Sequence, residues 1–251
     1  MITGLLALHD LLAPYLTSLF AAFLRIGALM LLVPGLGDRM IPVRIRLAAA
    51  FALSAAIAPI VDMPTVLDAG TISSETVTGL ALGAVLRFLA QALLMAGMMA
   101  AQLTSLSHIF GTQDPSSAMG NVLNMAGLAL LMAAGLPMML VEMLIRSYDV
   151  LPAGQWPDAS DFVRWGVSRM AHAFALAVGL AAPFALVALI YNAAMGVLNR
   201  AMPQLMVALV GAPAITALSG VVLFLAAPLM LTVWKAAMVA TLSDPITGAL
   251  R

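Results

Sequence analysis

The stretch AMPQLMVALVGAPAITALSGVVLFLAAPLMLTVW, residues 201–234, contains no Asp, Glu, Lys or Arg. Three further stretches are also free of charge, at positions 88–113, 115–141 and 170–199. About 20 apolar residues in a helix are enough to cross the hydrocarbon layer of a bilayer, and each of these stretches is longer than that. The sequence therefore predicts an integral membrane protein.

The composition of the whole chain agrees with this prediction. Of its 251 residues, 63% are hydrophobic and only 9% are charged, and the mean hydropathy is +1.09. A soluble domain carries far more charge than this. Backbone polar groups in lipid must bond to one another, and the alternating pattern of a barrel is missing, so we expect all-α spans.

Several functional classes lack their sequence signatures. The net charge is zero, without a basic run, so nucleic acid is not an expected partner. The chain has no cysteine, its only lysine (Lys235) follows no phosphate-binding glycine loop, and its three histidines are scattered. The stretch from Met1 to Phe20 lacks the basic start of a cleavable signal peptide. We therefore expect no enzyme, no catalytic residue, no cofactor and no metal site.

Six apolar segments are expected to form helices, joined by loops that contain Pro, Gly or acidic residues. The second segment is short for a lone span and better suits a helix buried among others. The last two are joined tightly, which predicts an antiparallel helical hairpin. The expected segments are 11–33, 44–61, 77–103, 122–145, 171–198 and 205–242, with loops at 62–75, 105–121 and 147–164.

Membrane orientation stays open, because Lys and Arg are almost evenly divided between the two sides of a six-span arrangement. One side would hold Arg146, Arg164, Arg169, Lys235 and Arg251, and the other Arg39, Arg44, Arg46 and Arg200. Two explanations remain: charges placed for protein partners, or helices that do not all span individually.

Polar residues inside apolar segments are costly in lipid and mark packing contacts or functional sites. Arg25 fits a packing residue paired with a carboxylate or carbonyl of a neighbouring helix; the alternative is contact with a partner or a pore. Arg87 and Gln91 share one helical face and leave the same two alternatives. Gly79 and Gly83 have the spacing that permits close helix approach.

Four groups of residues, in order along the chain, resemble the FliR family of flagellar type III export-gate proteins. The fourth group is the most specific. In segment four, where the family often reads Asn-Gly-His, this chain has Ala134-Gly135-Leu136, so any role of that histidine does not transfer. The groups are Phe23-Leu24-Arg25 with Pro34 and the Ile41–Leu47 step; Gly79 to Gly83 with Gln102 and Asp114-Pro115-Ser116-Ser117; Ser147-Tyr148-Asp149-Val150-Leu151-Pro152-Ala153-Gly154; and Asn199 to Leu205 with Gly211-Ala212-Pro213.

The resemblance implies a subunit of a helical export-gate assembly in the bacterial inner membrane, within the flagellar basal body. Residues 1–165 would resemble a FliP subunit and residues 166–251 a FliQ-like hairpin, together forming one domain. The implied partners are FliP-like, FliQ-like and FlhB-like subunits, membrane lipid, and the unfolded flagellar proteins that pass through the gate.

The resemblance also implies two sets of site residues. A loop that plugs the closed pore would match residues 104–120, where apolar bulk stands beside a glycine; packing of that bulk onto a surface is the alternative. The expected plug residues are Ser107, His108, Ile109, Phe110, Gly111, Asp114 and Pro115. The expected partner contacts are Arg25, Arg44, Arg46, Asn199, Arg200, Pro203 and Gln204.

Alternative functions remain open at this point. An injectisome export-gate subunit of the same superfamily would share most of these features. A polytopic small-molecule transporter could use prolines 183, 203, 213 and 228 to break helices around a binding site. No intramembrane carboxylate cluster favours that transporter.

Overall fold

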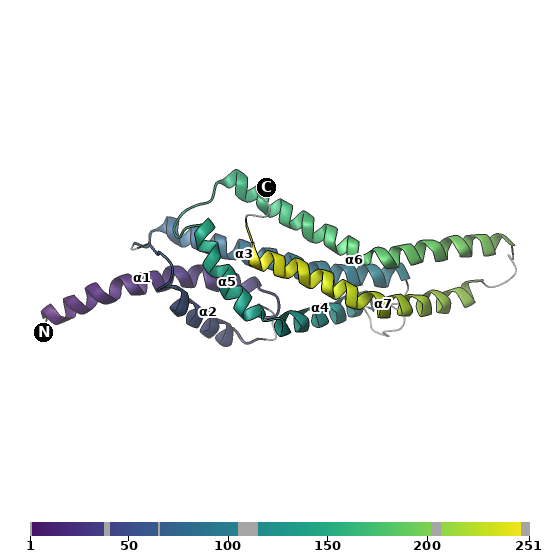
Figure 1. The fold of residues 1–251 in the computed structure, drawn as a ribbon, viewed down its shortest axis with the longest axis horizontal. Helices are drawn as coiled ribbons and strands as arrows, with labels where there is room; N and C mark the ends of the chain where they lie inside the picture. Colours follow the sequence, from purple (N-terminus) through teal and green to yellow (C-terminus); the bar gives the residue numbers. More distant parts are fainter. Residues whose placement is uncertain (1, 38–40, 65, 105–114, 202–206, 247–251) are drawn as a thin grey trace. The chain divides into compact units, whose positions relative to one another are not determined.

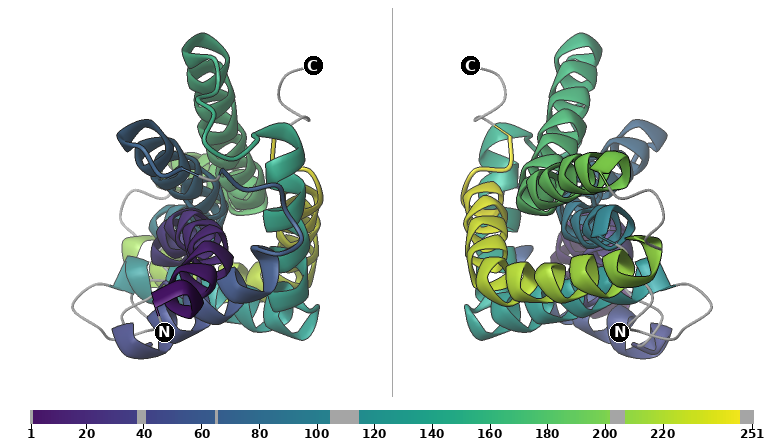
Figure 2. Two further views of the ribbon diagram at one scale, coloured as in Figure 1. Left: turned by 90° about the vertical axis from the view of Figure 1, so that its left-hand side faces the viewer. Right: turned by 90° about the vertical axis from the view of Figure 1, so that its right-hand side faces the viewer.

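Every regular element in the described part of the chain is an α-helix (Figure 1). The computed structural model describes residues 2–37, 41–64, 66–104, 115–201 and 207–246. The two views of Figure 2 likewise show only coiled helices and their connections. The all-α prediction is confirmed. The helices are α1 (Ile2–Leu32), α2 (Val43–Ile57), α3 (Ala69–Thr104), α4 (Pro115–Ala133), α5 (Leu136–Val150), α6 (Ala159–Ala201) and α7 (Val207–Ser243).

Four of these helices are long and apolar enough to cross a membrane. The spans are Leu12–Leu32, Ala69–Thr104, Ala159–Ala201 and Ala217–Ser243, and α4 with α5 makes a fifth if the pair is one broken span. The prediction of a polytopic membrane protein is confirmed. Helix α2 has only 15 residues, as expected for a segment too short to span alone.

Several predicted boundaries differ from the structure, among them the end of the expected 147–164 loop, since α6 begins at Ala159. The segment 122–145 is two helices, because Gly135 has φ 92° and the next helix starts with Pro137 in its first turn. Helix α4 begins at Pro115 rather than after residue 121, since proline suits the first helical position. Helix α3 begins at Ala69, so the second half of the expected 62–75 loop is helical.

Helix α2 is less buried within the chain than the sequence predicted. Only Ala50, Ser54 and Ile57 are buried, on the side of α2 that contacts α1. Four large side chains of α2 are more than half exposed: Val43, Ile45, Leu47 and Phe51. If this helix is buried among others, those helices belong to other molecules.

The chain folds as two compact units that do not follow one another in sequence. Unit 1 comprises residues 1–88, 135–170 and 238–251, and unit 2 comprises residues 89–134 and 171–237. The expected division at residue 165 concerns likeness to other subunits and stays a prediction.

Unit 2 is held together by small residues and one buried tryptophan. A Cβ on Gly97 of α3 would lie 2.6 Å from the Cα of Gly120 in α4, so the two backbones touch at glycine. Trp234 of α7 is fully buried, and its indole N–H donates to the Leu89 carbonyl at 2.7 Å. The ring also lies against Gly127, which leaves it room.

Helices α6 and α7 continue through their internal prolines. Pro183 lies inside α6 and Pro228 inside α7, and neither ends its helix. A transporter site built from broken helices would need interruptions at such positions. The described parts of α6 and α7 therefore give that alternative no support.

Candidate functional site

A close approach of α1 and α3 in unit 1 builds the frame of the candidate site. A Cβ on Gly79 would overlap the carbonyl oxygen of Arg25, and one on Gly83 would lie 2.9 Å from the Leu29 carbonyl oxygen. Only glycine permits this distance between the two backbones. The predicted packing role of Gly79 and Gly83 is confirmed.

Glu75 lies one helical turn before Gly79 and faces the same neighbour. The Arg25 guanidinium donates to both of its carboxylate oxygens, at 2.8 Å from Nε and 3.0 Å from Nη2. The exposed fractions are 1% for Arg25 and 0% for Glu75, so the pair is sealed from solvent. A bidentate pair of this kind compensates two charges that would be very costly alone.

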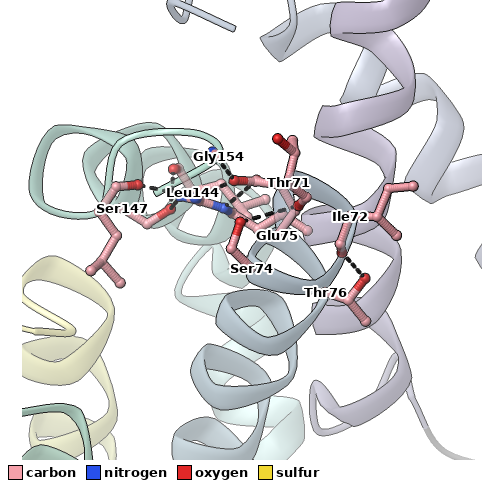
Figure 3. Close-up of polar contacts among 10 residues, drawn as sticks. Thr71, Ile72, Ser74, Glu75, Thr76, Leu144, Ser147 and Gly154 are labelled. Carbon is pink, nitrogen blue, oxygen red and sulfur yellow. Dashed lines mark hydrogen bonds and ion pairs between the residues drawn. The ribbon is translucent and has the colours of Figure 1, made fainter. Parts of the chain in front are cut away.

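The segment around the end of α5 completes the bonding of the pair (Figure 3). Arg25 also donates to the Leu151 carbonyl at 3.0 Å and to the Ser147 hydroxyl at 3.3 Å. Glu75 accepts the backbone N–H of Gly154 at 2.9 Å, and Figure 3 draws Glu75, Ser147 and Gly154 converging. The Arg25 guanidinium carbon lies 3.8 Å from the ring centroid of Tyr148. All of these partners belong to unit 1.

The loop conformation at Gly154 requires glycine. Its φ is 77°, and a Cβ there would lie 3.3 Å from the Thr71 hydroxyl oxygen. Its N–H points at Glu75 because the chain takes this turn directly after Pro152. The first and third sequence groups, at Arg25 and at 147–154, thus meet at one buried cluster: Arg25, Glu75, Ser147, Tyr148, Leu151 and Gly154, called here the Arg25 cluster.

Arg25 has the carboxylate and carbonyl neighbours of the packing alternative, and its expected contact with a partner stays a prediction. Sequence reasoning missed Glu75. The segment 62–75 was interpreted as a polar loop, so its last acidic residue was not matched with the arginine. The spacing of four between Glu75, Gly79 and Gly83 was the available signal, since it puts all three on one helical face.

The other expected partner contacts lie in different surroundings. In unit 1, Arg44 is exposed at the start of α2, whereas Arg46 is partly buried and donates to the Gly37 carbonyl at 3.1 Å. In unit 2, Asn199 and Arg200 are exposed near the end of α6. Pro203 and Gln204 lie outside the described residues. Contact with a partner stays a prediction for all of these residues.

The expected plug residues also lie almost wholly outside the described part of the chain. Residues 107–111 and Asp114 are not described, and Pro115 is the first residue of α4. The plug therefore stays a prediction from the resemblance.

A second polar cluster in unit 1 binds the end of α7. The carbonyls of Ser243, Asp244 and Pro245 accept bonds from Arg146 at 2.8 Å, Arg169 at 3.3 Å and the Trp165 indole N–H at 3.0 Å. Carbonyls at a helix C-terminus have no partner in their own helix and carry partial negative charge. Two arginines and a tryptophan therefore fix this end.

Trp165→Phe is expected to loosen the end of α7 while keeping the ring. The change removes the donor to the Pro245 carbonyl, and leaving a buried acceptor unsatisfied costs about 1–3 kcal/mol. Hydrogen exchange of backbone amides in residues 236–246 should become faster. Trp156→Phe is the control, because Trp156 is 55% exposed. Equal exchange in both variants contradicts a fixing role for Trp165.

Comparison with known proteins assigns the chain to a family. Residues 16–241 match the family described as bacterial export proteins, family 1. The chain is 33% identical over 202 residues to the flagellar biosynthetic protein FliR of Caulobacter vibrioides, covering 76% of this chain and 80% of that protein.

Two more relatives with the same name extend the match. FliR of Aquifex aeolicus is 28% identical over 225 residues, covering 86% of this chain and 87% of that protein. FliR of Escherichia coli is 29% identical over 210 residues, covering 79% and 80%. The resemblance to the FliR family is thus confirmed over most of the length of the chain. The chain belongs to the FliR family of bacterial export proteins, as a membrane component of the flagellar export apparatus.

Proposed function

We propose that this chain is one subunit of the flagellar type III export gate. With FliP-like and FliQ-like subunits it forms the channel through which unfolded flagellar proteins cross the inner membrane, and a FlhB-like subunit binds at its entrance. The observation that carries this proposal is the family match from residue 16 to 241, together with the long apolar helices that lie within it.

The distribution of buried surface supports an assembly. In the most apolar windows of α6 and α7, only 33% and 17% of residues are buried within the chain. Helix α2 is too short to span alone, yet it exposes four large apolar side chains. Apolar surface of this extent is covered by lipid or by other proteins. FliP-like and FliQ-like helices would cover the part that lipid does not.

The internal bonding of the Arg25 cluster supports a folding role for that cluster within the subunit. The hydrogen bonds of the cluster described above all lie within unit 1. The Tyr148 hydroxyl is buried and has no hydrogen-bond partner among the described residues. The cluster's contribution to export would be a rigid α1–α3–α5 frame.

The three relatives are all named as flagellar proteins, and they favour the flagellar branch over the injectisome alternative.

Deletion of the gene is expected to abolish flagellar filaments and swimming while growth continues at the normal rate. The physical reason is that a channel lacking one of its subunits does not close into a conducting assembly. Filaments are counted by electron microscopy and swimming is measured in soft agar.

Complementation with the intact gene is the control, and affinity purification of the complemented chain measures composition. Several FliP-like chains should accompany each copy. A deletion strain that swims without a second gene copy contradicts the proposal, and so does a chain that purifies only with itself.

A further inference from the structure

A small apolar pocket in unit 1 has no part in the function proposed above. Its walls come from α3 around Ala81 and Leu82, from Leu151 at the end of α5, from the stacked rings of Phe162 and Trp165 in α6, and from Ile246. Its volume is about 210 Å³. Small-molecule sites usually measure about 300–1,000 Å³, so this pocket suits a single anchoring side chain better than a cofactor.

The mouth of the pocket is negative. Asp158 and Asp161 line it, and both are exposed. The Ser160 hydroxyl, with the backbone N–H groups of Asp161 and Ser160, holds the pKa of Asp158 below its usual value. The only cation bonded to either carboxylate among the described contacts is Arg164, which pairs with Asp161 at 2.5 Å. Because that pair is exposed, it is weak and exchangeable.

The walls are fixed before anything binds. The Leu151 carbonyl accepts from Arg25, Gly154 in the same loop donates to Glu75, and the Trp165 indole N–H donates to the Pro245 carbonyl beside Ile246. A preformed pocket saves the cost of ordering its walls on binding. The Arg25 cluster and the bonds at the end of α7 thus hold different parts of the wall of one cavity.

We propose that this pocket is a docking site for another polypeptide, which inserts one large apolar side chain next to a lysine or arginine. The apolar walls receive the anchor, and the carboxylates at the mouth attract the adjacent cation. An anionic lipid headgroup would be repelled by the same carboxylates. The inference concerns unit 1 alone and does not depend on the composition of the gate.

The test uses the full chain in phosphatidylcholine nanodiscs and short capped peptides as probes. The peptides are acetyl-Ser-Gly-Leu-Lys-Gly-Ser-amide and its two variants with Glu in place of Lys or Ala in place of Leu. Saturation-transfer NMR measures binding, with empty nanodiscs as the blank. We expect the Leu-Lys peptide to bind at least about tenfold more tightly than either variant, with its Leu methyl groups in closest contact.

Two kinds of protein variant localise the binding. Ala81→Phe fills the pocket and should abolish binding; Val150→Phe fills it from the exposed mouth if the first variant does not fold. The double variant Asp158→Asn with Asp161→Asn removes both charges but keeps a side-chain oxygen at position 158 to accept the N–H groups at the start of α6. It should weaken binding and remove the salt dependence of binding. Asp62→Asn is the control outside the pocket and should bind like the unmodified chain.

Three results overturn the proposal. The first is equal binding, or no binding, of the Leu-Lys and Leu-Glu peptides. The second is undiminished binding by a folded variant whose pocket is filled. The third is displacement of the Leu-Lys peptide by phosphatidylglycerol in the nanodisc through the same pocket contacts, which assigns the pocket to lipid. Normal swimming of the deletion strain, together with intact peptide binding by the purified chain, would count against the proposed function and not against this site.

Discussion

Exchanging the two charges of the Arg25 cluster, by Arg25→Glu with Glu75→Arg, is expected to leave the protein as unstable as either single change. Removing one member of a buried pair costs about 3–5 kcal/mol, and Glu75→Ala should show this loss. The exchange does not restore the lost stability, because the groups around position 25 accept hydrogen bonds and the backbone group at position 75 donates one. A carboxylate at 25 would face the Leu151 carbonyl, and a guanidinium at 75 would face the Gly154 N–H.

Unfolding of the purified chain in increasing dodecyl sulfate, followed by circular dichroism, measures these differences. Asp161→Asn is the control, since it breaks an exposed pair with Arg164 and should change stability by less than about 1 kcal/mol. Near-normal stability of the exchanged pair would mean that only the mutual attraction of the two charges matters, and the directional bonding described above would then carry no weight.

Gly79→Ala is expected to destabilise the protein although it adds a single methyl group. In an exposed helix interior the same change stabilises by up to about 1 kcal/mol, because alanine is the better helix former. At Gly79 the methyl overlaps the Arg25 carbonyl oxygen, a backbone atom that cannot turn away. Overpacking of this kind costs about 1–3 kcal/mol or more, and it displaces the helix that carries Arg25.

Gly196→Ala is the matched control, since Gly196 lies in α6 with nothing within 4 Å of the added carbon. The same detergent titration should therefore give opposite signs for the two substitutions. If Gly79→Ala is as stable as Gly196→Ala, the close approach of α1 and α3 is not a constraint on the fold.

Much of the fold follows from hydropathy, whereas its interruptions do not. Long charge-free runs predict helices and spans because the backbone has no other solution in lipid. The break at Gly135 lies inside such a run, where hydropathy stays uniform, and Gly135 there has a positive φ. Gly135 with Pro137 two residues later was a local sign of it.

The start of α3 was missed for a different reason. Residues 62–75 hold three acidic residues and no basic one, a pattern expected of a loop, and the first turns of α3 add several Ser and Thr residues. In the structure the hydroxyls of Ser73 and Thr76 donate to the carbonyls of Ala69 and Ile72, four residues earlier in the same helix. Asp68 also accepts the Thr71 N–H in the first turn, which caps the helix. These residues satisfy one another within the helix, and polarity alone therefore misled the prediction.

The sequence predicted one member of the candidate site, Arg25, but not its partners. A lone arginine in an apolar helix demands a counter-charge, so pairing could be anticipated for Arg25. Its partners, however, are 50 residues away at Glu75 and 126 away at Leu151, separations that no local pattern encodes. Contacts with other subunits depend on surfaces outside this chain and could be inferred only from the family resemblance.

The separation between Arg25 and its partners has a consequence for how the chain is made. Ribosomes add about 5–20 residues per second, so the 126 residues from Arg25 to Leu151 take roughly 6–25 s to synthesise. During that time the first helix is complete, yet its arginine has neither the carbonyl nor the loop that will enclose it. Glu75 arrives earlier, about 50 residues after the arginine. The nascent chain thus carries an incompletely bonded cation in its first apolar helix until α5 has been translated. Stable insertion of that helix into the bilayer is therefore a late event of biosynthesis.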